Sequence, residues 1–120
     1  MKRDMELIRK MVLAVEEGPD GYVPDDLRID GYRPEHLAYH AHLLIQAGLA
    51  TGPITTHING SGPSAQIAAL TWDGHDFADA ARDETRWQKA MGIVQEKGGA
   101  VTLDIVKDVL LRLARASLGV

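Results

Sequence analysis

The sequence predicts one α+β domain in which helices predominate. Apolar residues recur at three- and four-residue spacing in several segments, as they do on the buried face of a helix. One segment, 49–71, instead alternates apolar and polar residues around a Gly/Pro-rich turn, which is typical of a β-hairpin. The chain has 120 residues, of which 45% are hydrophobic and none is cysteine. That length can bury a core without disulfides, so we expect a single domain over residues 1–120.

The first predicted helix spans residues 3–17 and ends at Gly18 and Pro19. Its apolar face carries Met5, Ile8, Met11, Val12 and Val15. Residues 18–33 are rich in turn formers, and only residues 27–29 look extended, so we expect a short strand there.

The next helix is predicted over residues 34–47, with Pro34 in its first turn and Gly48 after its end. Leu37, Ala41 and Leu44 form its apolar stripe. Two strands, 49–57 and 65–71, should then pair as a hairpin around a turn at 59–63.

Three capping residues, Thr71, Asp83 and Thr102, mark the starts of the remaining helices. The first two of these helices are either separate or joined with a kink, and Gly98 and Gly99 should end the second. Their predicted inward residues are Phe77, Ala80, Ala81, Trp87, Ala90, Met91 and Val94. The last helix is apolar over so wide an arc that we expect it to bury two sides; the arc comprises Leu103, Ile105, Val106, Val109, Leu110, Leu111, Leu113 and Ala114.

The order helix, short strand, helix, hairpin, helix is that of a winged-helix domain. Residues 39–49 (YHAHLLIQAGL) resemble the end of a winged-helix recognition helix, and residues 70–77 (LTWDGHDF) are similar to the return from the wing. With residues 1–10 (MKRDMELIRK) and Trp87, these segments resemble a family of short bacterial and prophage proteins classified as a domain of unknown function. The resemblance implies a winged-helix core, residues 1–81, with a helical extension, 82–120. It implies no reaction.

Charge is unevenly distributed along the chain. Residues 1–33 carry six basic and eight acidic side chains, and residues 82–120 carry seven basic and five acidic ones. Residues 34–81 contain no Lys or Arg and four acids. The predicted recognition helix and wing are therefore poorly suited to meeting a polyanion.

Two functions are compatible with these features. The first is a DNA-binding transcriptional regulator, and it is slightly preferred because the winged-helix fold so often serves that role. The second is a protein-interaction module, an adaptor or inhibitor, which the cation-free surface suits better. Either function would use the same predicted binding residues, namely Tyr39, His42, Gln46, Thr55, His57, Asn59 and Ser61.

No catalytic residue, cofactor or metal site is predicted. His36 and His40 share a helix face and, with His42 nearby, could hold a metal if His75 or Asp76 completed the site. In the alternative reading, His40 is packed and bonded to backbone while His36 and His42 are solvated. The cluster of Asp73, His75, Asp76 and Asp79 resembles a carboxylate–histidine site, but Asp73 and Asp76 are expected to stabilise the helix dipole.

Two basic clusters are interpreted as solvated helix faces with local ion pairs; they are Lys2, Arg3, Arg9 and Lys10, and Arg82, Arg86 and Lys89.

Trp87 is expected in the core. Trp72 either plugs the base of the wing or is exposed as an anchor for a partner. We further expect a homodimer through the N- and C-terminal helices. No signal peptide or membrane span is predicted, and a cytoplasmic location is expected.

Overall fold

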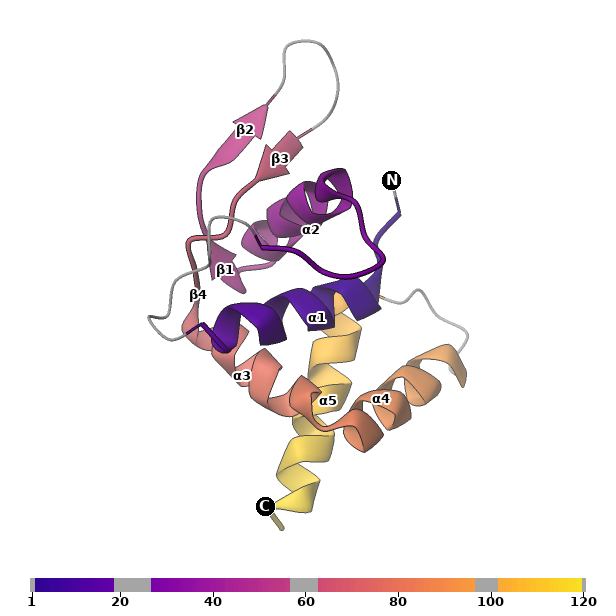
Figure 1. Ribbon diagram of the computed structural model, residues 1–120. Coiled ribbons are helices and arrows are strands. Elements are labelled where there is room, and N and C mark those ends of the chain that lie inside the picture. The colour runs from indigo at the N-terminus through magenta and orange to yellow at the C-terminus, as the bar shows by residue number, and fades with distance from the viewer. Residues whose placement is uncertain (1, 19–26, 57–62, 97–101, 120) are drawn as a thin grey trace. The chain divides into compact units, whose positions relative to one another are not determined.

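The computed structural model describes residues 2–18, 27–56, 63–96 and 102–119 (Figure 1). The fold is α+β and mostly helical, as predicted. The chain forms two compact units, Met1–His75 and Asp76–Val120, with the boundary inside helix α3. The expected division into a core, 1–81, and an extension, 82–120, stays a prediction.

Helix α1, Met5–Glu16, begins two residues later than predicted because Asp4 is its N-cap. The Asp4 carboxylate accepts a hydrogen bond from the Leu7 N–H at 3.1 Å, which satisfies one of the free donors at the helix start. The predicted apolar face is confirmed as buried, together with Leu7. This face packs against α2 and β4.

The predicted strand at residues 27–29 is wrong. These residues form no strand, and a turn follows, in which the Tyr32 N–H donates to the Ile29 carbonyl at 3.2 Å and Gly31 adopts a φ of 88°. A strand needs a partner, but in the described part of the chain each strand already pairs within a two-stranded sheet. The hairpin is therefore two-stranded there, without a third strand.

Helix α2, Pro34–Gln46, closely matches its prediction, with Pro34 at its first position. Gly48 follows with a φ of 79°, a left-handed conformation that glycine adopts without strain. Within the predicted stripe, Ala41 and Leu44 are buried while Leu37 is half-buried. The helix packs against α1, β1 and β3.

The predicted hairpin forms, but an irregular segment interrupts each strand. At its base, β1 (Ala50–Thr51) pairs with β4 (Ala69–Leu70), and farther out β2 (Ile54–Thr56) pairs with β3 (Pro63–Ala65). The segment that joins β3 to β4 is one residue longer than the segment that joins β1 to β2, so the hairpin contains a bulge. In Figure 1, β2 and β3 extend away from α1. The predicted turn residues 59–62 lie outside the described residues.

Thr71 joins the base of the hairpin to α3, Trp72–Arg82. Its hydroxyl donates to the Gly48 carbonyl at 2.6 Å and accepts from the Gly74 N–H at 3.1 Å. Its own N–H donates to the Leu49 carbonyl at 3.0 Å. The predicted capping role of Thr71 is thus confirmed. Gly74 lies so close to the chain that a Cβ there would collide with the Leu49 carbonyl oxygen.

In the second unit, α3 is followed by α4, Glu84–Glu96, and α5, Leu103–Ser117. Asp83 separates α3 from α4 by accepting the Arg86 N–H at 2.8 Å, so the two helices are distinct. Thr102 caps α5 through the Ile105 N–H. The predicted end at Gly98 and Gly99 lies outside the described residues.

The core of the second unit is centred on Trp87, which is 1% exposed. The edge of its ring meets Phe77, with centroids 6.4 Å apart. The two sides of α5 differ in burial, because Val106 and Leu110 are fully buried while Ile105 is 43% exposed. Part of the apolar arc of α5 is therefore exposed in the single chain.

Candidate functional site

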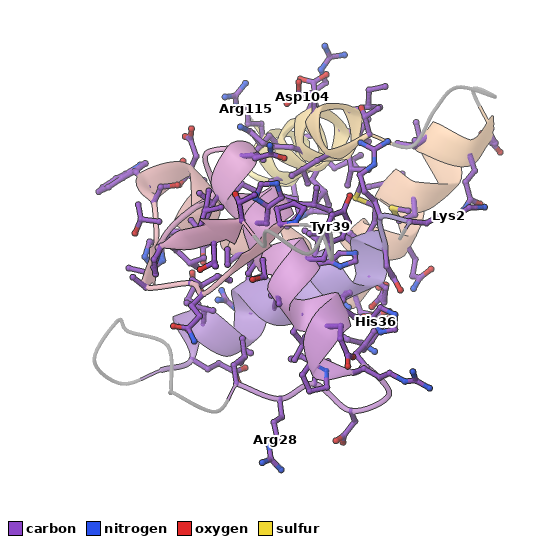
Figure 2. All side chains as sticks on the ribbon, turned by 90° about the horizontal axis from the view of Figure 1, so that it is seen from above. Lys2, Arg28, His36, Tyr39, Asp104 and Arg115 are labelled. Carbon is purple, nitrogen blue, oxygen red and sulfur yellow. The ribbon has the colours of Figure 1, made fainter. Side chains whose placement is uncertain are left out.

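The binding residues predicted on α2 are partly covered. Tyr39 and His42 are half-buried, with ring centroids 6.3 Å apart, and Gln46 near the end of the helix is exposed. No residue of α2 from His36 to Ile45 is exposed. His36 and Tyr39 lie along this helix in Figure 2. Of the predicted binding residues on α2, only Gln46 is therefore fully accessible.

The hairpin is the more accessible part of the predicted site. All three residues of β2 are exposed, including Thr55, and Ile54 is 46% exposed. His57, Asn59 and Ser61 lie outside the described residues. The binding roles of the seven predicted residues stay predictions.

Both ring nitrogens of His40 are engaged, and its side chain is 1% exposed. Nε2 accepts the Asp4 N–H at 2.9 Å, and Nδ1 donates to the His36 carbonyl at 2.8 Å. The ring proton is assigned to Nδ1, because a nitrogen that accepts an N–H carries no proton itself. This geometry matches the alternative reading, in which His40 is packed and bonded to backbone.

The other two histidines of the cluster are half-buried rather than solvated as that reading expected. His36 Nδ1 accepts the Arg33 N–H at 3.4 Å, which closes the start of α2. His42 Nδ1 is buried and has no hydrogen-bond partner among the described residues. Within the described residues, no three His, Asp or Glu side chains lie close enough together to hold a metal ion.

A polar network beside this cluster was not predicted. The Tyr32 hydroxyl donates to the Asp4 carboxylate at 2.9 Å, and the Lys10 ammonium lies 5.7 Å from the centre of the Tyr32 ring. Burial, followed by the hydrogen bond and charge of Asp4 and the charge of Glu6, raises the pKa of Tyr32 above 10.0. Nothing in the sequence around Asp4 indicates its partners Tyr32 and His40, which lie 28 and 36 residues away along the chain.

The residues near the start of α3 that resemble a carboxylate–histidine site contact other partners. His75 Nδ1 lies 3.1 Å from Glu16 Oε2, and Asp79 pairs with Arg82 at 2.9 Å. Asp73 and Asp76 are exposed, and Asp73 occupies the first turn of α3, where an acid stabilises the helix dipole.

Two residues of the predicted basic clusters are less solvated than expected. Arg9 is 8% exposed and lies 3.4 Å from Glu6. Arg86 is half-buried and donates to the Ala80 carbonyl and the Ser117 hydroxyl at 3.2 and 3.3 Å. Arg86 therefore ties helices of the second unit together instead of presenting a charge to a ligand.

The two tryptophans differ sharply in exposure. Trp87 is in the core, as predicted, whereas the side chain of Trp72 is 83% exposed. This exposure excludes a plugging role for Trp72 and leaves the alternative, that it lies at the surface as a candidate anchor.

None of the helices in the described ranges combines the length and the apolar character needed to cross a bilayer.

Comparison with known proteins finds no solved structure that matches the chain. A protein of Haemophilus influenzae described as "Uncharacterized protein" is 32% identical over 112 residues, which cover 91% of this chain and 92% of that protein. The model of the family described as "Hypothetical protein (DUF2513)" matches residues 2–100. A family of unknown function was expected from the sequence segments, and the chain belongs to the DUF2513 family.

Proposed function

We propose that the first unit is a winged-helix core that binds another protein, and that the chain has no catalytic role. The order of α1, α2, the hairpin and the start of α3 supports the fold. Gly48 at the end of α2 and Thr71 at the return to α3 match the two turns that a winged helix requires. The core departs from the common pattern at residues 27–33, where the described chain forms neither a helix nor a third strand.

The observation that carries the choice of partner is the composition of the exposed surface. Residues 34–81 contain no Lys or Arg, while Trp72 and Ile54 are exposed at 83% and 46%. DNA affinity comes largely from cations that neutralise phosphates, and this segment supplies none. Exposed tryptophan is a frequent anchor of protein interfaces. The surface therefore suits a protein better than a duplex.

DNA binding is the second candidate. The exposed amide of Gln46 and hydroxyl of Thr55 favour it, because such groups hydrogen-bond bases and phosphates. In this function, α2 would enter the major groove and the hairpin would lie over the backbone. A bacterial or prophage regulator of transcription would then be the biological role.

We also propose a homodimer, in which α5 supplies most of the contact. Ile105 on α5 and Leu118 just after it are 43% and 78% exposed, although both are large and apolar. The apolar face of α1 is already buried within the chain, so α1 offers less than expected to a second copy.

A double variant, Gln46→Lys with Thr55→Lys, discriminates the two candidate functions. Both positions are exposed, so the fold should tolerate the change. On a protein-binding surface the new charges should weaken capture of the partner from a bacterial lysate. On a DNA-binding surface they should strengthen binding to random duplex DNA, measured by anisotropy at about 50 and 200 mM salt.

The matched control is Thr85→Lys with Gln95→Lys, which adds the same charges at exposed positions of α4. We expect the wild type and this control to capture the same protein from the lysate, and the double variant to lose it. Tight duplex binding by the wild type, falling steeply with salt and rising in the double variant, would reject protein binding in favour of DNA.

A further inference from the structure

Three helix ends meet at the start of α3. Thr71 bonds to the carbonyls of Gly48 and Leu49, which places the end of α2 beside Trp72. One turn into α3, His75 lies 3.1 Å from Glu16 in the last turn of α1. We call the region formed by Trp72, Asp73, His75, Glu16 and Gly48 the Trp72 surface.

The Trp72 surface is electrically negative for several independent reasons. Asp73 is exposed, and Glu16 and Glu17 lie at the end of α1. The carboxyl-terminal ends of α1 and α2 each carry a partial negative charge, and neither helix has a basic residue in its last turn. The start of α3 contributes partial positive charge, and Asp73 with its full negative charge lies in that first turn.

The segment that carries Gly48, Trp72, Asp73 and His75 supplies no lysine or arginine to this surface. Residues 34–81 contain no Lys or Arg. Arg33 precedes the opposite end of α2, which at 13 residues is about 20 Å long. His75 is the one residue of the Trp72 surface that can carry a positive charge, and it faces Glu16.

An indole in this setting is suited to a cation. The face of a tryptophan ring attracts Arg and Lys side chains, more strongly than the other aromatic rings do. Arginine fits best, because its planar guanidinium stacks on the ring and can also donate to a carboxylate such as Asp73. At 83% exposure, the indole of Trp72 is accessible to such a stack.

We infer that the Trp72 surface docks an arginine-bearing segment of the partner protein. This inference rests on the proposed protein-binding function and names the chemistry of the partner. Trp72 stacks on a guanidinium, while Asp73 and the ends of α1 and α2 supply the complementary charge.

The test uses a short synthetic peptide containing several arginines spaced by glycine and serine, and a matched peptide with glutamates in their place. Acrylamide quenching reports on the exposed Trp72, because Trp87 at 1% exposure is shielded. The arginine peptide should protect Trp72 from acrylamide, and added salt should reduce the protection. The glutamate peptide should give none.

Affinity for the labelled arginine peptide should fall roughly fivefold in Trp72→Ala and roughly threefold in Asp73→Asn, measured by anisotropy. Two exposed residues elsewhere serve as controls and should leave affinity unchanged. Gln95→Ala removes an exposed side chain of α4. Asp104→Asn removes an exposed acid from the first turn of another helix, α5 (Figure 2).

Equal affinity of wild type and Trp72→Ala for the arginine peptide, or equal protection by the glutamate peptide, would overturn the inference. The captured partner separates this failure from that of the proposed function. A partner lost by the Gln46→Lys and Thr55→Lys variant but retained by Trp72→Ala and Asp73→Asn overturns only the inference. Steeply salt-dependent duplex binding without a protein partner overturns the proposed function itself.

Discussion

Asp4 connects α1 to two distant parts of the first unit. Its carboxylate accepts both the Leu7 N–H and the Tyr32 hydroxyl, and its own N–H donates to His40. The first of these bonds was not predicted, because the helix was expected to begin at residue 3, which places Asp4 inside it rather than at its cap. The other two bonds could not be predicted either, because periodicity reports the face of a helix and not the neighbour that covers it.

Replacing His40 with leucine should lower the free energy of unfolding by about 1–3 kcal/mol. The change leaves the Asp4 N–H without its acceptor and removes the bond to His36. Urea unfolding measures the loss. As a control, His75→Ala removes an exposed side-chain contact with Glu16 and should cost under about 1 kcal/mol. Equal small losses in both variants would contradict a structural role for the His40 bonds.

Deprotonation of Tyr32 should destabilise the first unit in alkali. Its pKa is raised in the folded protein by burial first, then by Asp4 and Glu6. Its contribution to stability is therefore fully present below the ordinary value of 10.0 and is lost as pH rises through the folded pKa. The difference between the ultraviolet titrations of wild type and Tyr32→Phe isolates this group. A midpoint at or below 10.0 would contradict the expectation.

At the scale of elements, two glycines inside helices, Gly74 and Gly92, allow a direct comparison of the same substitution. A Cβ at Gly74 would collide with the Leu49 carbonyl, whereas a Cβ at Gly92 in α4 would meet open space. Gly74→Ala should therefore destabilise the protein by about 1–3 kcal/mol, because the start of α3 must move. Gly92→Ala should stabilise it by about 0.5–1 kcal/mol through helix propensity. Urea unfolding of both variants checks the signs, and a stabilising Gly74→Ala would show that α3 does not pack as described.

Local signals were enough to predict most elements. Pro34, Thr71, Asp83 and Thr102 each begin or cap a helix as their chemistry indicates. The strand expected at residues 27–29 failed for a non-local reason, since alternating residues form a strand only where a partner completes the ladder. The bulge in the hairpin was missed for the same reason, because register belongs to two strands together.

Only part of the candidate site was predictable from sequence. The absence of Lys and Arg from residues 34–81 could be read directly, and it bears on function whatever the fold. The exposure of Trp72 could not be predicted, because an indole directly after a strand is compatible with either a buried or an exposed position. The convergence of the ends of α1 and α2 on it depends on contacts between residues as far apart as Glu16 and His75.

At the scale of the whole molecule, the proposed homodimer predicts the mass of the protein in solution. One chain has a mass of 13.1 kDa, and the proposed dimer should appear at about twice that mass by light scattering at tens of micromolar. Ile105→Glu should shift the mass towards the monomer, because it places a charge on the exposed apolar part of α5. Ile54→Glu, on the hairpin, is the control and should leave the mass unchanged. A wild-type mass near 13.1 kDa would exclude the dimer.

The closure of the hairpin at its base has a consequence for engineering. Thr71 holds the chain at Gly48 and Leu49, and Ala50 pairs with Leu70, so the two ends of the hairpin are fixed to each other. Segments whose ends are held together in this way accept foreign sequence without disturbing the rest of a domain. The hairpin is therefore a suitable unit to exchange as a whole for another hairpin, with the junction of α2 and α3 left intact.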